Sequence, residues 1–235
     1  MLVIAHRGAS GHAPENTLAA FRLALEMGAK ALEFDVHQTS DGELVVIHDD
    51  DFKRVARRKD KVGALSLGEI QAIDVGSWMG NGFGGERAPT LAQVYDLAQG
   101  RAEFHLEIKH GSSVYPGIEA RVLAFLERRR ALAQTLISSF DHRALFSVRG
   151  LEPRARIGYL LGLTPMPKAW REIEWMRAES LNISQRQASV PRVRAAHDRG
   201  LKVLVYTVTK QQELDRLARL GVDGAFCNYP ELRPS

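Results

Sequence analysis

The chain has 235 residues, of which 45% are hydrophobic and 26% charged, and its formal net charge is +4 at pH 7. This composition is ordinary for a soluble globular protein, and the length suits one large α/β domain or two small ones. The weak positive charge does not require a nucleic-acid partner and mildly favours small anionic substrates. The single cysteine, Cys227, excludes an internal disulfide and fits a reducing compartment.

The N-terminal residues 1–10 contain an apolar run of only five residues before His6 and Arg7. They lack the charged start and the long apolar core of a signal peptide. No apolar run approaches the ~18 residues that a membrane span needs. We therefore expect a cytoplasmic protein with no stable membrane insertion.

The first elements predict a βαβ unit. Residues 2–5 are typical of a short buried strand, and residues 15–27 have helical periodicity that ends at Gly28. Residues 31–36 form the next expected strand, so the two strands should be parallel neighbours.

A hairpin is expected next. In the strand 31–36, apolar side chains alternate with Glu33 and Asp35, so both carboxylates share one face. Asp41 and Gly42 predict a two-residue turn into a second strand, residues 44–47. That register would place Asp35 opposite His48.

Residues 52–89 interrupt the pattern, because they are basic early and glycine-rich late. We expect one short helix there, residues 67–73, capped by Ser66. With few apolar positions, this segment would bury little area as an independent domain. We interpret it as a small insertion over one end of a single domain that spans residues 1–235.

Strands and helices then alternate to the end of the chain. The expected strands are 103–109, 134–139, 155–161, 180–183, 201–208 and 224–227. The expected helices are 90–98, 114–130, 141–149, 167–179, 189–198 and 211–220. Without the antiparallel strand 44–47, eight strands with helix-length links predict a (β/α)8 TIM barrel. An open doubly wound sheet is the alternative, but the chain lacks the G-x-G-x-x-G turn that would favour it.

Barrel enzymes place their sites at the carboxyl ends of the strands, where acidic residues gather in this chain. Glu107 and Lys109 should face the barrel axis, as Glu33 and Asp35 do. Three carboxylates without three basic partners predict a divalent cation, and oxygen ligands favour Mg²⁺ or Ca²⁺. The alternative is a network of salt bridges with Lys109 and Arg7 alone.

His6 and His48 flank strand ends beside charged neighbours and offer an acid–base pair. Arg7 and Lys109 would add fixed positive charge, which suits a phosphate group developing charge in a transition state. The remaining histidines are interpreted as structural: His12, His37, His105, His110, His142 and His197.

A set of short stretches occurs in a specific order: His6-Arg7-Gly8, Pro14-Glu15-Asn16-Thr17, Glu33-Phe34-Asp35-Val36, Asp41-Gly42, His48-Asp49, Pro89-Thr90-Leu91, Glu107-Ile108-Lys109, Ser139-Phe140-Asp141 and Gly221-Val222-Asp223-Gly224. Together they resemble the glycerophosphodiester phosphodiesterase family over essentially the full chain. The resemblance implies a barrel enzyme that splits glycerophosphodiesters into glycerol 3-phosphate and an alcohol, with a cyclic phosphate between the two steps.

The resemblance also implies roles for individual residues. Glu33, Asp35 and Glu107 would bind the metal. His6 and His48 would serve as general acid and base, and either histidine fits either role. The substrate-binding residues would be Arg7 and Lys109 on the phosphate, Glu15 supporting the first loop, and Tyr206 and Asn228.

Two of these positions depart from the family pattern. Tyr206 stands where the family usually has tryptophan, and Asn228 stands where it usually has aspartate. We expect the loss of a carboxylate at Asn228 to weaken any preference for a cationic leaving group such as choline.

Two other functions stay open. A lysophospholipase D would need an apolar mouth, which the insertion could provide through Phe52, Trp78, Met79 and Phe83. A catalytically inactive barrel could bind phosphorylated ligands, although such a protein has no use for a paired acid and base. The basic run near Lys53 lacks aromatic residues, so a nucleic-acid partner is not expected.

Overall fold

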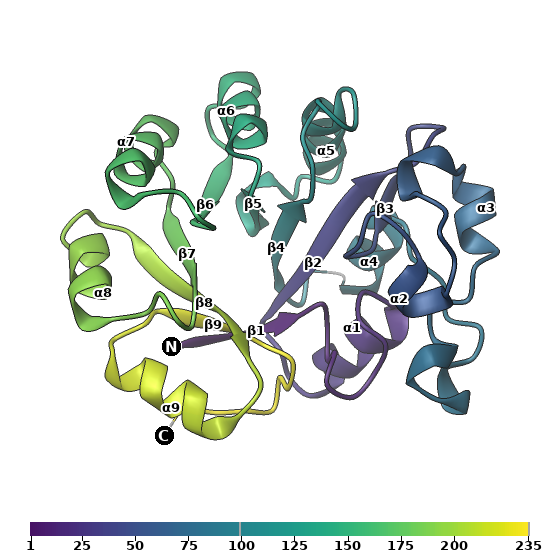
Figure 1. Cartoon of the computed structure of the whole chain (residues 1–235), viewed down its shortest axis with the longest axis horizontal. Coiled ribbons are helices and arrows are strands. Elements are labelled where there is room, and N and C mark those ends of the chain that lie inside the picture. The colour runs from purple at the N-terminus through teal and green to yellow at the C-terminus, as the bar shows by residue number, and fades with distance from the viewer. Residues whose placement is uncertain (99, 235) are drawn as a thin grey trace.

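The fold is a closed barrel of parallel strands surrounded by helices (Figure 1). The computed structural model describes residues 1–98 and 100–234. Among these residues, eight parallel strands follow the order β1-β9-β8-β7-β6-β5-β4-β2, and β1 pairs with β2 to close the ring. The strands are β1 (Leu2–His6), β2 (Ala31–Gln38), β3 (Leu44–Val46), β4 (Glu103–Ile108), β5 (Thr135–Ser139), β6 (Arg156–Leu160), β7 (Ser180–Ser184), β8 (Lys202–Val208) and β9 (Gly224–Cys227). The predicted (β/α)8 architecture is confirmed.

Helices connect the strands and cover the outside of the barrel (Figure 1). The α-helices are α1 (Leu18–Glu26), α2 (Lys53–Ala56), α3 (Leu67–Gln71), α4 (Leu91–Ala98), α5 (Ile118–Arg128), α6 (His142–Leu151), α7 (Met166–Met176), α8 (Val190–His197) and α9 (Gln211–Arg219). Short 3₁₀ turns are η1 (Val62–Ala64), η2 (Ser77–Met79), η3 (Asn81–Phe83) and η4 (Leu132–Gln134). The described helices are all too short or too polar to cross a membrane.

The alternation in β2 separates two environments. Leu32, Phe34 and Val36 point outward and are fully buried in the core between the strands and the helices. Glu33 and Asp35 point into the barrel. A smaller apolar cluster fills the barrel interior beneath them and contains Ile4, Ala31, Leu136, Leu204 and Phe226. The site therefore has an apolar floor.

Two helices begin later than the periodicity predicted. α1 begins at Leu18 and not at residue 15, because Thr17 is its N-cap and accepts a hydrogen bond from the Ala20 amide. α5 begins at Ile118 and not at residue 114, because Gly117 adopts a left-handed conformation with φ of 77°. In both cases the residues before the helix form loops at the carboxyl ends of strands.

The hairpin between β2 and β3 corrects the predicted register by one residue. The Gly42 amide donates to the Thr39 carbonyl, and Gly42 has a φ of 85°. This geometry is a three-residue loop whose last residue is left-handed, and not the two-residue turn that was expected. The Ile47 amide consequently donates to the Asp35 carbonyl at 3.0 Å, so Ile47 and not His48 opposes Asp35. His48 lies one residue beyond the end of the ladder.

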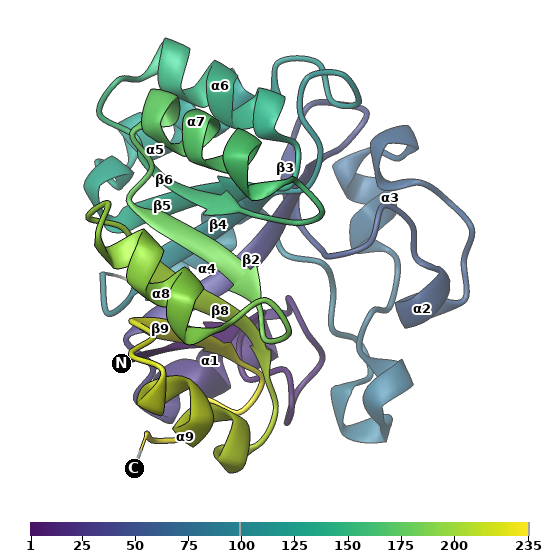
Figure 2. The same ribbon diagram turned by 60° about the vertical axis from the view of Figure 1, so that its left-hand side comes forward.

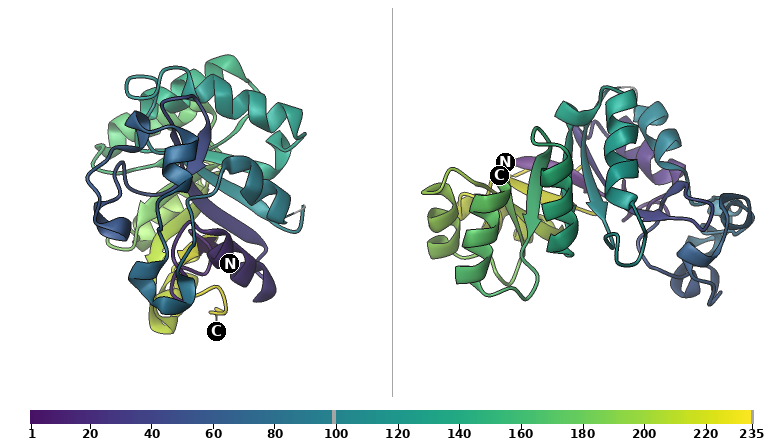
Figure 3. Two further views of the ribbon diagram at one scale, coloured as in Figure 1. Left: turned by 90° about the vertical axis from the view of Figure 1, so that its right-hand side faces the viewer. Right: turned by 90° about the horizontal axis from the view of Figure 1, so that it is seen from above.

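The segment 52–89 extends from one side of the barrel mouth (Figure 2 and Figure 3). It has a small core of its own with Val45 and Ile47 of the hairpin; the other members are Phe52, Val55, Val62, Ile70, Ile73, Val75 and Ala88. Ser66 caps α3 through a capping box with Glu69, as predicted. Phe52 is fully buried, so it cannot contribute to an exposed apolar mouth. The single-domain boundaries stay a prediction.

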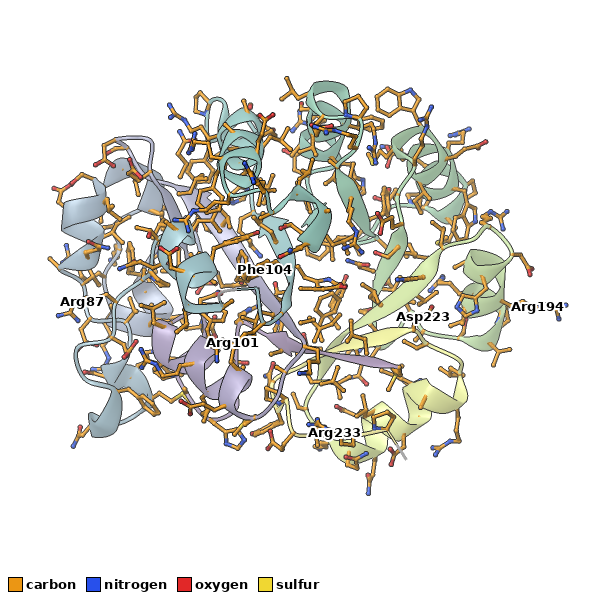
Figure 4. All side chains as sticks on the ribbon, turned by 180° about the vertical axis from the view of Figure 1, so that it is seen from behind. Arg87, Arg101, Phe104, Arg194, Asp223 and Arg233 are labelled. Carbon is orange, nitrogen blue, oxygen red and sulfur yellow. The ribbon has the colours of Figure 1, made fainter. Side chains whose placement is uncertain are left out.

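Asp223 makes structural contacts at the opposite end of the barrel, where the strands begin. Asp223, labelled in Figure 4, accepts a hydrogen bond from the Val203 amide at 2.7 Å and lies 2.8 Å from the His197 ring. The carboxylate thus ties the start of β9 to β8 and to the end of α8. The interpretation of His197 as structural agrees with this contact.

Candidate active site

A sharp turn after β1 aims Arg7 at the acidic residues of β2. Arg7 and Gly8 both have left-handed backbones, with φ of 56° and 81°. A side chain on Gly8 would collide with Ala20 of α1, since a Cβ there would lie 2.6 Å from the Ala20 carbonyl carbon. The turn lets the Arg7 amide donate to Glu33 Oε2 at 2.9 Å, while Arg7 Nε lies 3.2 Å from Asp35 Oδ2.

Strand pairing brings the three predicted metal ligands together. Asp35 of β2 lies directly beside Glu107 of β4, and Glu33 lies beside His6 of β1. One carboxylate oxygen from each of Glu33, Asp35 and Glu107 lies within 4.8 Å of the others, and all three residues are buried. The sequence prediction that these side chains converge inside the barrel is borne out by this cluster.

The three buried carboxyl groups have different pKa values, because their surroundings differ. Burial and the charge of Asp35 raise the pKa of Glu33 well above its usual value, and burial raises the pKa of Glu107 to about 7. Burial also acts on Asp35, but Lys109 and Arg7 outweigh it and hold the pKa of Asp35 well below its usual range. Asp35 is therefore the permanent anion of the cluster.

The cations near the cluster do not neutralise it. Lys109 Nζ lies 2.8 Å from Glu107 Oε1 and 3.2 Å from Asp35 Oδ1, yet neither oxygen accepts a well-directed hydrogen bond. With every carboxyl deprotonated, the site holds three permanent cations and five carboxylates, an excess of two negative charges: Arg7, Arg54 and Lys109 against Glu15, Glu33, Asp35, Asp49 and Glu107. Without a bound cation, the raised pKa values of Glu33 and Glu107 favour protonation, which lowers this excess. One divalent cation would balance this excess, which salt bridges alone leave in place.

The two predicted acid–base histidines have different partners. His6 Nδ1 lies 2.7 Å from Asn228 Oδ1, whereas His48 Nδ1 lies 2.6 Å from the carboxylate of Asp49. Burial and the charge of Arg7 lower the pKa of His6 to about 4. Burial also lowers the pKa of His48, but the charge of Asp35 and the hydrogen bond to Asp49 oppose that shift. Of the two rings, His48 is therefore the better able to hold a proton.

A guanidinium network supports both sides of the mouth. Arg54 donates to both oxygens of Glu15 and, through Nε, to Asp49 at 2.7 Å. Glu15 in turn accepts from Arg7 Nη1 at 2.9 Å. Glu15 thus lies behind Arg7 and supports the first loop, as the family resemblance implied, while Arg54 carries the support from the segment 52–89 to His48.

A cavity of about 200 Å³ opens between these residues and the other half of the barrel. Its charged wall consists of His6, Arg7, Glu33, His48, Glu107 and Lys109. Its uncharged wall consists of Ser138, Phe140, Leu160, Tyr206, Thr207 and Phe226. A larger but shallow groove of about 430 Å³ lies on the outer flank between the hairpin, α4 and α5, and it contains none of the predicted site residues.

The structure separates the two substrate-binding residues predicted on the last strands. Tyr206 lines the cavity, and its ring lies 6.0 Å from the ring of Phe140. Asn228 is taken up by its contact with His6 and does not line the cavity. Because the side-chain oxygen of Asn228 contacts the His6 ring, we expect Asn228 to hold His6 in place and not to contact the alcohol.

Sequence reasoning missed three groups at this site. Asn16 donates to Asp35 Oδ2 at 2.9 Å. Phe140 and Phe226 belong to the cavity wall, although apolar residues near strand ends are usually packing residues. His37, interpreted as structural, contacts the backbone of His48. The motif Pro14-Glu15-Asn16-Thr17 was a signal for Asn16, but nothing in the spacing pointed to its partner.

Known proteins match both the sequence and the fold of this chain. The chain is 38% identical over 232 residues to a glycerophosphodiester phosphodiesterase of Caldanaerobacter subterraneus, covering 98% of this chain and 95% of that protein. The barrel superposes on a phosphodiesterase of Oleispira antarctica, solved with the product sn-glycerol-3-phosphate, with a TM-score of 0.87 at 33% identity over 98% and 94% of the two chains. A glycerophosphodiester phosphodiesterase of Agrobacterium tumefaciens gives a TM-score of 0.86 at 29% identity over 99% and 98%.

The family model described as the glycerophosphoryl diester phosphodiesterase family matches residues 6–232. This range begins at His6, one of the two histidines of the cavity, and includes every residue of its charged wall. The chain belongs to the glycerophosphoryl diester phosphodiesterase family.

Proposed function

We propose that this protein hydrolyses small glycerophosphodiesters to glycerol 3-phosphate and an alcohol, using a divalent cation and the His6–His48 pair. The observation that carries the proposal is the convergence of three buried carboxylates beside a cavity that two of them, Glu33 and Glu107, line together with two histidines and two fixed cations. The product found in the Oleispira antarctica relative supports the same substrate class.

The cation would be held by Glu33, Asp35 and Glu107. Their donor set is oxygen only, which suits Mg²⁺ or Ca²⁺. Asp35 Oδ1 and Glu107 Oε1 are buried without a well-directed hydrogen bond, which is the condition expected of ligand atoms. A cation bound there would polarise a phosphoryl oxygen and offset the charge that develops on it.

The phosphate would be oriented by Arg7 and Lys109, which approach the cluster from opposite sides. Arg7 is fixed by Asp35 and Glu15, and Lys109 by Asp35 and Glu107. Because both side chains are already paired and mostly buried, little conformational entropy is lost when they receive a substrate.

The histidines would divide acid and base roles according to their partners. The amide oxygen of Asn228 accepts from His6 Nδ1, so the Nε2 lone pair of His6 faces the cavity as a base. The carboxylate of Asp49 stabilises a proton on His48 and makes it the acid. His6 takes the proton of a glycerol hydroxyl as its oxygen bonds to phosphorus, and His48 gives its proton to the departing alcohol. Water then opens the cyclic phosphate with the roles reversed.

The uncharged wall favours a second candidate, a lysophospholipase D activity. Phe140 is 45% exposed at the edge of the cavity, and the exposed Leu163 follows Gly162, which packs against the Phe140 ring. These residues come from the loops after β5 and β6 and not from the segment 52–89. They would extend the aromatic wall of Tyr206 outward along an acyl chain.

The test is release of glycerol 3-phosphate from glycerophosphocholine, glycerophosphoethanolamine and glycerophosphoglycerol, each with chelator and with added Mg²⁺ or Ca²⁺. Release with a cation and none with chelator is the expected result. Including lysophosphatidylcholine, whose cleavage is measured as choline release because its other product keeps the acyl chain, separates the two candidates. A lysophospholipase D would prefer this acyl substrate to glycerophosphocholine. An enzyme that leaves all four diesters intact with either cation would contradict the proposal.

A further inference from the structure

His37, at the end of β2, lies directly behind the proposed acid His48. Its side chain is fully buried, and Nε2 lies 3.1 Å from the His48 carbonyl oxygen while Nδ1 lies 2.7 Å from the Tyr115 hydroxyl. Tyr115 is itself buried in the loop between β4 and α5. The three residues form a continuous chain of contacts from that loop to the backbone of His48.

The chemistry of these atoms determines which group donates in each of the two hydrogen bonds of His37. A carbonyl oxygen only accepts, so Nε2 of His37 must carry a proton and donate it to His48. In a neutral ring Nδ1 is then the acceptor, and the Tyr115 hydroxyl donates to it. Removing that hydroxyl takes away the group that favours this tautomer.

The position of His48 explains why such a contact is needed. The β2–β3 ladder ends at Ile47, whose amide donates to Asp35, so His48 lies beyond the regular strand. Its ring is held by Asp49, which Arg54 joins to Glu15 of the first loop, and this network acts on the side chain of His48. The His37 ring contacts the backbone of His48 instead, through its carbonyl oxygen, and joins it to β2.

Tyr115 is fixed in turn by the segment 52–89. A Cβ on Gly63 would lie 2.8 Å from Tyr115 Cε1, so the bare backbone of η1 packs against the ring. The ring of His110 also lies 6.0 Å from that of Tyr115. The Tyr115 ring is therefore held between η1 and His110, neither of which lines the cavity.

We infer that His37 and Tyr115 are positioning residues, which hold the backbone of His48 so that its ring meets the departing alcohol. This inference rests on the proposed acid role of His48. A loss of position should slow the step that needs the acid and leave a step that does not need it nearly unchanged.

The test compares two substrates in single-turnover measurements of alcohol release. Glycerophosphocholine has a leaving group that requires protonation, whereas a glycerol 3-phosphate ester of 4-nitrophenol has one that departs unprotonated. We expect His37→Leu to slow release of choline about tenfold or more and release of nitrophenol less than about twofold. His37→Gln keeps an N–H near the place of Nε2 and should recover most of the rate. Tyr115→Phe, which keeps the packing on Gly63, should show the same contrast more weakly.

A matched control separates position from stability. The Tyr95 hydroxyl is buried like that of Tyr115, but its partner is Thr135 and neither residue lines the cavity. Tyr95→Phe should lower the melting temperature without changing the ratio of the two rates.

The two substrates, measured with His48→Ala, distinguish a failure of the proposed acid role of His48 from a failure of the positioning inference. If His48→Ala itself lacks the contrast between the substrates, the proposed acid role is wrong. If His48→Ala shows the contrast and neither His37→Leu nor Tyr115→Phe does, the positioning inference is wrong. The double variant His37→Leu/His48→Ala should be no slower than His48→Ala alone, and a further tenfold loss would also overturn the inference.

Discussion

The two walls of the cavity are built from the same kind of strand end but differ in chemistry. On one side β1, β2 and β4 supply charged residues, and the loop after β3 adds His48. On the other side β5, β6, β8 and β9, with the loop after β5, supply uncharged ones: Ser138, Phe140, Leu160, Tyr206, Thr207 and Phe226. The charged wall is cross-linked by ion pairs, whereas the uncharged wall is formed mainly by aromatic and aliphatic side chains.

This difference indicates a division of labour. Groups that move protons or stabilise charge must be held in place, because displacement by about 1 Å costs roughly a hundredfold in rate. The ion pairs of Arg7, Lys109 and Arg54 provide that rigidity on the charged wall. An apolar wall accepts leaving groups of different shape with small energy differences. We therefore expect changes in the charged wall to abolish turnover and changes in the uncharged wall to alter substrate preference.

The largest effect is expected at the carboxylate cluster. Asp35→Ala, Glu33→Ala and Glu107→Ala should each lower turnover by at least ~10³-fold, since a cation contributes several kcal/mol to the transition state. Each should also lower the affinity for Mg²⁺ or Ca²⁺, measured by calorimetry. Asp96→Ala, which removes an exposed carboxylate paired with Arg129, is the control and should leave both quantities unchanged. If a variant of Glu33, Asp35 or Glu107 kept wild-type turnover, the claim that changes in the charged wall abolish turnover would be wrong.

The next effect concerns the histidines. His6→Ala and His48→Ala should each slow turnover by ~10²-fold or more, the usual scale for a general acid or base. Because the pair acts as a unit, the double variant should lose far less than the product of the single losses. Circular dichroism should show an intact fold in each case. A double variant that turns over at nearly the wild-type rate would remove both residues from the mechanism.

Metal binding should depend on pH through Glu107. Burial raises the pKa of Glu107 to about 7, so the cation-free protein keeps this carboxyl protonated below that pH. A cation must displace the protons of Glu107 and of Glu33, whose pKa is also raised. Its apparent affinity should therefore rise with pH, by up to about tenfold per pH unit for each displaced proton, and the slope should decrease above pH 7 where Glu107 is already deprotonated. Calorimetric titrations from pH 5.5 to 8.5 measure this slope. Affinity that is independent of pH over this range would mean that Glu107 is not a ligand.

Asn228 links the two walls, because it directly follows the last strand, β9, but contacts His6 of the first. Asn228→Asp places a carboxylate on His6 Nδ1 and should raise the pKa of His6 by about one unit, the scale of a partly screened charge pair. The acidic limb of the pH–rate profile should move to higher pH, and the ratio of glycerophosphocholine to glycerophosphoglycerol turnover should stay within about twofold. A large gain for the choline substrate at low salt, with an unmoved profile, would instead place Asn228 against the leaving alcohol.

The smallest effect is expected at Tyr206. Tyr206→Ala removes one aromatic ring from the uncharged wall and should raise KM about tenfold or less, the equivalent of at most about 1.4 kcal/mol. The value of kcat should change little if the ring contacts the alcohol, as the division between the walls predicts, and not the reacting atoms. Tyr206→Phe serves as the control that keeps the ring. A fall in kcat without a change in KM would contradict the division between the walls.

The sequence predicted the barrel and the charged wall because both depend on local patterns. Alternation placed Glu33, Asp35 and Glu107 inside, and parallel pairing then required Asp35 and Glu107 to be neighbours. The hairpin register was wrong by one residue, since whether Gly42 ends a two-residue or a three-residue loop depends on hydrogen bonds that the dipeptide does not specify.

The contacts that join distant segments could not be predicted from the sequence. Asn228 and His6 are 222 residues apart, and His37 meets Tyr115 across 78 residues. A buried histidine with two partners has no signature that separates it from a packing residue. Apart from Tyr206, the uncharged wall was missed for a related reason, because Phe140 and Phe226 look like core residues until the barrel closes around them.

The central claim is that one divalent cation, held by the three inward carboxylates, is needed for hydrolysis. The most direct measurement is a calorimetric titration of the chelator-treated protein with Mg²⁺ or Ca²⁺, with glycerol 3-phosphate release measured on the same samples. We predict that one cation binds per chain, that release rises in proportion to occupancy from almost zero, and that Asp35→Asn loses both together. Full release in excess chelator, or binding that leaves Asp35→Asn unaffected, would contradict the account.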